Sequence, residues 1–378
     1  MGYWKNKLLE WDQRGYGSIG TVVCHGCFGD YAIKEYIKRH GKRQKCDYCH
    51  NIRKSHSLEE VIGLIVESAY AEYEDANGCM GYESKEGGFI GANTFDAYDF
   101  IHDELNQEME IENEDLLNDI TNTISDSITW CEYNPYGLRL HEYDYQEWEK
   151  FTNEVKKTPS KKIMSYDILK KISLYIEELD LIVQSGKGCG FYRSRGHTKL
   201  ETYSSAKSLG APPTDSATAN RFSKCGESMF YGAEDIDTTL EEIADQKYEA
   251  VTTAKFYPTR SLLLLDLTKI KKIKWISLFD ERRELRSPLI FLREFQKAIA
   301  QPVNGVIEEY LPTQMFSTYL RTIFKTATGA CLDGIIYESS RIANKKCYAL
   351  FFNNDDMVEN KSNKFNKLWV DKSTIKRM

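Results

Sequence analysis

Four cysteines near the N-terminus have the spacing of a metal-binding site. They form two C-x-x-C pairs separated by eighteen residues, namely Cys24, Cys27, Cys46 and Cys49. Each pair can present two thiolates from a tight turn, and four thiolates complete a tetrahedral shell around Zn²⁺. We therefore predict a closed, structural zinc site whose binding energy helps a small segment to fold. The alternatives are a redox dithiol, or a site in which His25 or His50 replaces one cysteine.

A second set of reactive side chains lies in the C-terminal half, in four short motifs. Their order along the chain is Phe191-Tyr192-Arg193-Ser194-Arg195, Asn220-Arg221-Phe222, Phe230-Tyr231-Gly232 with Glu241-Glu242 after it, and Tyr337-Glu338-Ser339-Ser340. Arginine forks bind phosphate oxygens at two points, and a tyrosine face attracts a cationic ring. A carboxylate can stabilise the positive charge that develops on a sugar as its glycosidic bond breaks. Each residue taken singly is more often structural, so only the ordered set points to chemistry.

This order of motifs resembles the RES-domain family, over about residues 188–355. The resemblance implies a fold like that of the ADP-ribosyltransferases and a toxin that consumes NAD⁺. Such an enzyme cleaves the nicotinamide–ribose bond, as an NAD glycohydrolase or an ADP-ribosyltransferase, and a partner antitoxin or regulatory protein usually restrains it. The resemblance also implies a HEPN-like N-terminal region, here with zinc, and a role in a toxin–antitoxin system or in defence against phage.

The resemblance assigns five residues, and the first three are two arginines and one tyrosine. Arg193 and Tyr231 match their family positions, and Arg221 matches an arginine whose usual preceding glycine is asparagine in this chain. NAD⁺ carries two phosphates, which the arginines would bind, and a cationic nicotinamide ring, on which the tyrosine would stack. Arg195 would be an auxiliary phosphate contact.

The other two assigned residues are a glutamate and a serine. Glu242 matches the family glutamate, with Glu241 as a rival, and would stabilise the charge that develops on the ribose. Ser339 matches the family serine and would orient the ribose or the amide, but glutamate replaces the usual preceding proline, so the choice between Ser339 and Ser340 stays open. The implied catalytic set is Glu242, Tyr231, Ser339 and Arg193, and the implied NAD⁺-binding set is Arg193, Arg221, Tyr231 and Ser339.

We expect an α+β protein, in which a mainly helical, zinc-stapled N-terminal domain precedes a mixed β-sheet domain. The predicted parts are a four-cysteine module over 1–56, a helical acidic domain over 57–155 and a catalytic domain over 164–378. A basic stretch over 155–162, interrupted by proline and serine, indicates the boundary. The long interval between Glu242 and Ser339 indicates an insertion around 261–300.

The pattern of apolar residues predicts the elements that must position these side chains. Helical spacing is present over 57–75, 96–108, 113–128, 166–184, 236–246, 287–300 and 313–325. The first helix should begin at Ser57 with the S-x-x-E pattern of a capping box, and the fourth should end at Gly186. Short apolar runs predict strands over 190–193, 228–231, 261–267, 273–279, 334–337 and 347–352.

The charge and hydropathy of the chain argue against nucleic acid as a partner of the catalytic domain and against a membrane. The formal net charge is −7, and between Asp96 and Glu149 the only Lys or Arg is Arg139. Because nucleic acid is anionic, we do not expect the catalytic domain to bind it. No apolar run reaches the length of a membrane span, and no secretory signal is evident. A reducing cytoplasm is therefore the expected location, and homo-oligomerisation is left open.

Two other functions compete with an NAD⁺-consuming enzyme. One is a binding protein whose zinc module recognises nucleic acid or protein beside an inactive scaffold, and basic residues between Lys34 and Lys54 favour it. The other is a HEPN-type ribonuclease, which needs an arginine four to six residues ahead of a histidine, whereas Arg53 and His56 are closer than that. A Rossmann-type site is rejected because the glycines at 186–190 are expected after a helix rather than after a strand.

Overall fold

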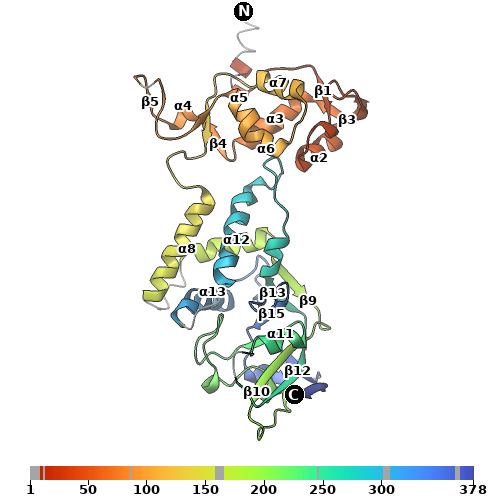
Figure 1. Ribbon diagram of the computed structural model, residues 1–378, viewed down its shortest axis with the longest axis vertical. Coiled ribbons are helices and arrows are strands. Elements are labelled where there is room, and N and C mark those ends of the chain that lie inside the picture. Colours follow the sequence, from red (N-terminus) through yellow and green to blue (C-terminus); the bar gives the residue numbers. More distant parts are fainter. Residues whose placement is uncertain are drawn as a thin grey trace, which may run out of the picture. The chain divides into compact units, whose positions relative to one another are not determined.

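The computed structural model describes residues 9–11, 13–85, 87–157, 166–244, 247–300, 307–361 and 367–378. The chain forms two compact units (Figure 1), which are Met1–Tyr143 with Trp275–Pro288, and Asp144–Lys274 with Leu289–Met378. The boundary expected at 155–162 falls partly on residues outside the described ranges, and the second unit begins earlier, at Asp144. The chain therefore passes between the two units three times.

The first unit contains small sheets surrounded by short helices. In one three-stranded antiparallel sheet the order is β1 (Val22–Cys24), β3 (Ile52–Ser57) and β2 (Lys42–Lys45), and in the other it is β4 (Tyr73–Asp75), β8 (Trp130–Glu132) and β7 (Thr94–Phe95). A two-stranded ribbon pairs β5 (Tyr82–Glu83) with β6 (Gly88–Phe89). The helices are α2 (Tyr31–His40), α3 (Leu58–Ala69), α4 (Ala76–Cys79), the run α5–η2–α6 (Ala97–Met109) and α7 (Glu114–Thr123).

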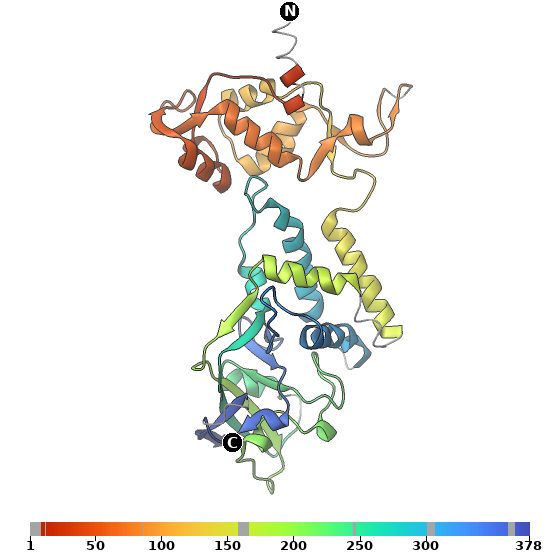
Figure 2. The same cartoon turned by 180° about the vertical axis from the view of Figure 1, so that it is seen from behind.

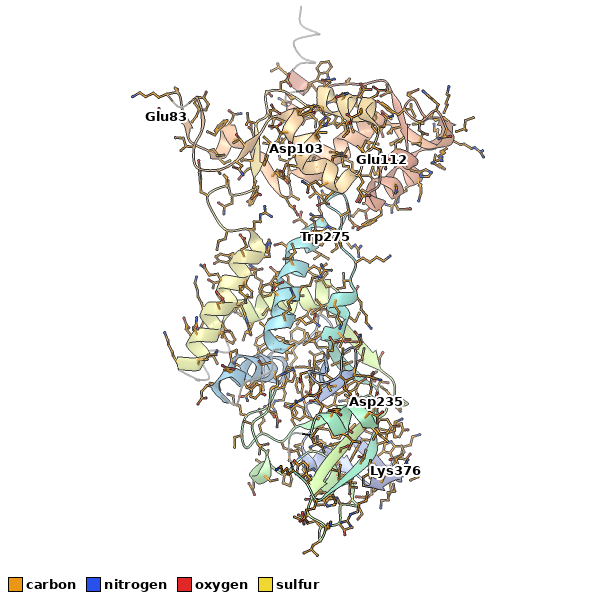
Figure 3. The ribbon with its side chains drawn as sticks, viewed as in Figure 1. Glu83, Asp103, Glu112, Asp235, Trp275 and Lys376 are labelled. Atoms are coloured by element: carbon orange, nitrogen blue, oxygen red, sulfur yellow. The ribbon has the colours of Figure 1, made fainter. Side chains whose placement is uncertain are left out.

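The core of the first unit forms between α3, the α5–α6 run and the returning segment 275–288. The rings of Phe100 and Trp130 stack with centroids 4.3 Å apart, and Leu278 and Phe279 of the returning segment are buried in the same cluster. Arg286 lies 4.8 Å from the ring centroid of Trp275, which is labelled in Figure 3. The strand predicted over 273–279 is therefore wrong, because none of these residues joins a sheet and those from Trp275 onward belong to the first unit.

Arg286 is a buried arginine that forms ion pairs at the edge of this core. Only 5% of the residue is exposed, and its guanidinium donates to Glu72 at 2.6 Å and to Glu108 at 2.5 Å. Removing a glutamate partner is costly, because the buried guanidinium then lacks part of its compensating charge, whereas the glutamates themselves are partly exposed. The returning segment is therefore held by charge as well as by apolar packing.

The three predicted helices of the first unit begin within one residue of the predicted start, whereas α2 and α4 were not predicted. Helix α3 starts after Ser57, yet the serine side chain makes no capping bond, so the predicted capping box is wrong. The helix ends at Ala69 rather than Asp75, because Tyr73 to Asp75 pair with β8. The predictions over 96–108 and 113–128 correspond to Ala97–Met109 and to the shorter Glu114–Thr123.

The second unit is built on a nine-stranded mixed sheet. Its order is β16 (Met357–Val358), β17 (Leu368–Arg377), β12 (Ala250–Pro258), β10 (Phe191–His197), β11 (Phe230–Ala233), β15 (Lys346–Leu350), β14 (Gly334–Glu338), β13 (Leu262–Asp266) and β9 (Ile182–Ser185). Most neighbours are antiparallel, and β13–β14 and β16–β17 are parallel. This arrangement confirms an α+β chain with a mixed sheet in its C-terminal part.

Helices gather beside the β9–β13–β14 end of this sheet. In Figure 2, α9 (Asp167–Glu178) crosses α12 (Arg286–Ala300), with α13 (Leu311–Thr322) nearby and α8 (Leu140–Lys157) alongside. Aromatic rings join them: Phe295 of α12 lies 4.9 Å from Trp148 of α8 and 5.1 Å from Phe316 of α13. The short α11 (Ile236–Glu241) instead lies against β10 and β11, at the other part of the sheet.

Several predictions for the second unit need correction. The helix expected over 166–184 ends at Glu178, because Asp180 adopts φ 51° and the chain then forms β9. The glycines at 186–190 therefore follow a strand and precede β10, and no helix follows them, so the Rossmann reading still fails. The strand β13 lies within 261–300 and belongs to the sheet, so that stretch is not simply an insertion. Helix α8 and the long strands β12 and β17 were not predicted.

Among the described residues, no helix combines the length and the apolar character needed to cross a membrane.

Candidate functional site

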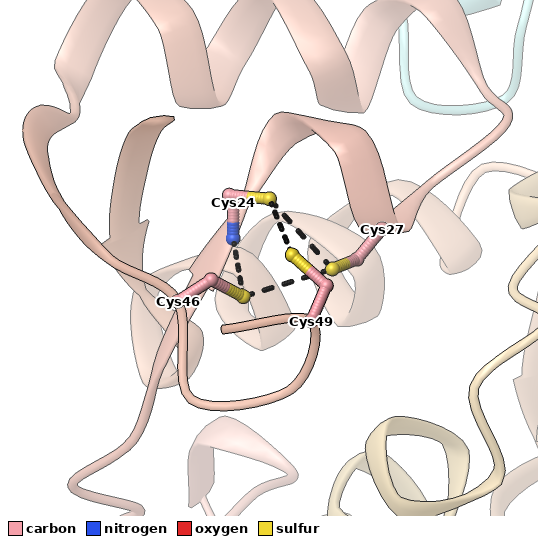
Figure 4. A group of neighbouring side chains, drawn as sticks. All are labelled: Cys24, Cys27, Cys46 and Cys49. Carbon is pink, nitrogen blue, oxygen red and sulfur yellow. Dashed lines mark hydrogen bonds between the residues drawn. The ribbon is translucent and has the colours of Figure 1, made fainter. Parts of the chain in front are cut away.

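The four predicted cysteines converge in the first unit. Figure 4 shows their sulfur atoms turned toward a common centre, and all four lie within 4.8 Å of one another. The sulfur of Cys24 is 3.8 Å from that of Cys27 and 3.5 Å from that of Cys49, and Cys27 is 3.7 Å from Cys46. A tetrahedron with metal–sulfur bonds of about 2.3 Å has sulfur–sulfur distances of about 3.8 Å. The group could therefore hold a metal ion, and no histidine among the described residues joins it.

The three-stranded sheet positions both cysteine pairs. Cys24 ends β1 and Cys27 follows one turn later, while Cys46 and Cys49 form the loop between β2 and β3. The central strand β3 pairs with both outer strands, so it holds the two loops at the same end of the sheet. The backbone N–H of Cys24 also donates to the sulfur of Cys46 at 3.3 Å, which suits a thiolate.

The second candidate site is a cavity of about 800 Å³ in the second unit. It lies where β10 and β11 separate, since these two strands pair only at Tyr192 and Ala233. Beyond this point β10 pairs with β12, and β11 pairs with β15. The cavity is lined by side chains from all four sequence motifs, including Arg193, Arg195, Arg221, Tyr231, Glu242 and Ser340. A volume in the range of about 300–1,000 Å³ suits a small-molecule ligand.

Two arginines on β10 face the cavity. Arg193 and Arg195 are two residues apart, so they share one face of the strand, and Arg193 donates through Nη1 to the carbonyl oxygen of Tyr231 across the gap between β10 and β11. Both Nε atoms are buried without a hydrogen-bond partner, and neither guanidinium forms an ion pair with a carboxylate of the described residues. Burial lowers the pKa of Arg193 to about 9, and the positive charge of Arg195 adds to the shift. Such a pair favours an anionic ligand.

Tyr231 holds the turn that carries Arg221. The tyrosine oxygen lies 2.9 Å from the hydroxyl of Ser223 and accepts from the backbone N–H of Phe222 at 3.3 Å. The side chain of Gln314, which is 1% exposed, donates to the carbonyl oxygens of Asn220 and Ser223 from the other side. The turn is therefore fixed on both sides, and burial of the tyrosine raises its pKa, so its hydroxyl keeps the proton.

Glu242 forms the acidic part of the cavity. Helix α11 begins at Asp235, labelled in Figure 3, whose side chain accepts from the backbone N–H of Thr238. Glu242 follows the last turn of this short helix, and its Oε1 accepts from the hydroxyl of Ser339 at 2.6 Å. The thiol of Cys347 lies 3.6 Å from the same oxygen. The carboxylate is thus oriented by two neighbouring groups while it lines the cavity.

The two glutamates and the two serines that the sequence left as alternatives lie in different places. Glu242 lines the cavity and Glu241 does not. Ser339 is 6% exposed and contacts Glu242, whereas Ser340 lines the cavity itself. The five residues implied by the family resemblance therefore lie in or beside one cavity, and the two serines occupy different places in it.

Further residues line the cavity without having been singled out from the sequence. Tyr337 lies beside Arg221, whose guanidinium carbon is 5.9 Å from its ring centroid, and burial raises the pKa of Tyr337 well above its usual value. Tyr248 covers the backbone of Gly196, where an added Cβ would collide with the ring. Tyr337 belongs to the Tyr-Glu-Ser-Ser motif, so its motif was visible. Tyr248 lies in no motif, and only the fold brings it to the cavity.

Comparison with known families matches most of the chain. A family model described as HEPN/RES N-terminal domain 1 matches residues 39–159, and one described as RES domain matches residues 191–370. The second range contains all of the cavity-lining residues. Comparisons with curated proteins and with solved structures give no match.

Proposed function

Because the chain belongs to the RES-domain family, with a HEPN/RES N-terminal domain ahead of its RES domain, we propose that the second unit binds NAD⁺ and cleaves its nicotinamide–ribose bond. The observation that carries this proposal is that two arginines with buried Nε atoms, neither ion-paired with a carboxylate of the described residues, share one cavity with Glu242. NAD⁺ supplies a diphosphate for the arginines, and its glycosidic bond breaks through a positively charged sugar that a carboxylate stabilises.

Each group would have a separate part in the reaction. Arg193 and Arg195 bind the diphosphate, and Arg221, which lines the same cavity beside Tyr337, adds a further contact to it. The face of Tyr231 receives the nicotinamide ring, since its hydroxyl already holds the 220–223 turn. Glu242 then lies against the ribose and stabilises its developing charge. The bond electrons leave with nicotinamide, which departs as a neutral base, and water or another nucleophile bonds to the ribose carbon.

The four-cysteine group would hold Zn²⁺, which we assign from the sulfur-only ligand set and the tetrahedral sulfur spacing. With four protein ligands the ion has no open position for substrate, so its part is to hold the β1 and β2–β3 loops together. We further propose that the enzyme acts in the cytoplasm as a toxin, in a toxin–antitoxin or phage-defence system, and that a partner protein restrains it.

The test is nicotinamide release from NAD⁺ by the purified full chain, followed by chromatography. We expect wild type to release nicotinamide, Glu242→Gln to lose at least about 100-fold in rate by removal of the charge that stabilises the transition state, and Glu241→Gln to retain wild-type activity. The Glu241 variant is a matched control, because it makes the same change one residue away, outside the cavity. Equal losses in the two variants, or no release by wild type at high enzyme concentration, would contradict the proposal.

A further inference from the structure

The β2–β3 hairpin of the first unit carries a dense positive charge. Between residues 34 and 54 the chain has eight Lys or Arg and two acidic residues, within a protein of net charge −7. All four residues of β2 are exposed, and three of them, Lys42, Arg43 and Lys45, are basic. On β3 the neighbouring Arg53 and Lys54 are also exposed.

The register of the hairpin places like charges opposite one another. Arg43 pairs directly with Lys54 across the two strands, an arrangement that destabilises an isolated hairpin. No carboxylate of the described residues forms an ion pair with Lys42, Arg43, Lys45, Arg53 or Lys54, although the nearby Lys38 and Arg39 are paired with Glu35 and Glu281. The repulsion is therefore not relieved within the part of the chain that the structure describes.

The hairpin is also held rigidly by the cysteine group. Its loop is the Cys46–Cys49 turn, and a side chain on Gly26, in the other cysteine loop, would collide with the guanidinium of Arg53. Lys42, Arg43 and Lys45 are thus exposed on a two-stranded ribbon whose strands are about 4.8 Å apart, with residues rising about 3.4 Å along each strand. The ammonium group of Lys54 donates to the carbonyl oxygen of Gly41 at 3.0 Å and stays on the same hairpin.

We propose that this hairpin binds the phosphate backbone of nucleic acid. A two-stranded ribbon fits the major groove of duplex DNA, and lysine and arginine contacts to phosphates do not require a particular base sequence. A membrane surface fits less well, because interfacial binding also needs a broad apolar face, and Ile52 is the one large apolar residue exposed on the two strands. This binding is separate from the catalytic cavity and does not depend on the NAD⁺ reaction.

The test measures binding of the full chain to fluorescent oligonucleotides over a series of salt concentrations. The hairpin variant Arg43→Gln/Lys45→Gln/Lys54→Gln is compared with Lys170→Gln/Lys297→Gln/Lys372→Gln, which removes the same charge from exposed lysines of the second unit. Duplex DNA, duplex RNA and single strands of equal length distinguish the preferred form. Zinc content and melting temperature establish that each variant is folded, and the single variants Arg43→Gln and Lys45→Gln replace the triple variant if it is not.

We expect wild type and the control to bind nucleic acid with similar affinity and a steep salt dependence. The hairpin variant should bind at least about tenfold more weakly, and the slope of log K against log salt should fall by about three, one for each lost phosphate contact. Equal weakening in the control, no weakening in the folded hairpin variant, or tighter binding of wild type to polyglutamate or to phosphatidylserine vesicles than to nucleic acid would overturn the proposal.

Discussion

Ser339 offers a prediction that separates a positioning role from direct substrate binding. Its hydroxyl donates to Glu242 at 2.6 Å and accepts from the backbone N–H groups of Arg341 and Ile342 at 3.1 and 3.2 Å. Because Ser339 is buried beside the cavity, substrate should meet Glu242 rather than the serine. Ser339→Ala removes a hydrogen bond to a charged group, which contributes about 1.5–3 kcal/mol. Since about 1.4 kcal/mol is a factor of ten in rate, kcat should fall about 10- to 150-fold while KM changes less than about twofold.

The assay is steady-state nicotinamide release over a range of NAD⁺ concentrations. Ser340→Ala is the matched control, because Ser340 lines the cavity and its loss should raise KM more than it lowers kcat. In a Glu242→Gln background, Ser339→Ala should add little, since the serine acts through the glutamate. A tenfold rise in KM with unchanged kcat, or fully additive effects of the two substitutions, would refute the reasoning.

Three further predictions concern the arginine pair, the tyrosine and the metal. Arg195→Met should remove the repulsion between the two arginines and the desolvation of one of them. The melting temperature of the free protein should rise by about 2–4 °C for each kcal/mol gained, and the KM for NAD⁺ should rise as well. A lower melting temperature with unchanged KM would contradict this prediction. Tyr231→Phe should lower the free energy of unfolding, measured in urea, by about 1–2 kcal/mol, because the hydrogen bonds to Ser223 and Phe222 are lost. It should also raise the KM for NAD⁺. A variant with the stability and KM of wild type would argue against the role of Tyr231 in holding the turn. Elemental analysis should find one zinc ion per chain in wild type and none in Cys46→Ser. The melting temperature of this variant should be lower than that of wild type. Zinc retained by the variant would count against the four-cysteine site.

The sequence predicted best those features that depend on short stretches of chain. The cysteine spacing alone anticipated a group whose sulfur atoms lie within 4.8 Å of one another, because two tight loops can meet only if the intervening segment folds back. The strands carrying Arg193 and Tyr231 were also found, since their apolar runs have flanking turn residues. The insertion predicted around 261–300 was wrong, because this interval contains in succession a strand of the sheet, a segment that packs in the core of the first unit, and a helix.

Features that depend on contacts between distant parts of the chain could not be predicted from the sequence. Helix α8 was not predicted, because its buried residues Trp148 and Phe151 pack against rings that lie elsewhere in the chain, those of Phe295 and Tyr166. Helix α9 stopped early because residues 182–185 could pair with β13, which no local pattern reveals. That Glu242 lines the cavity and Glu241 does not likewise depends on how the end of α11 lies in the fold.

The returning segment has a consequence for synthesis on the ribosome. Leu278 and Phe279 belong to the core of the first unit, yet they emerge more than 130 residues after Tyr143, the last residue of that unit's main stretch. At about 5–20 residues per second, the wait is roughly 7 to 27 s. The N-terminal unit therefore cannot complete its core until five of the nine strands of the other unit's sheet, β9 to β13, have been made. A nascent chain interrupted in that interval leaves this core open.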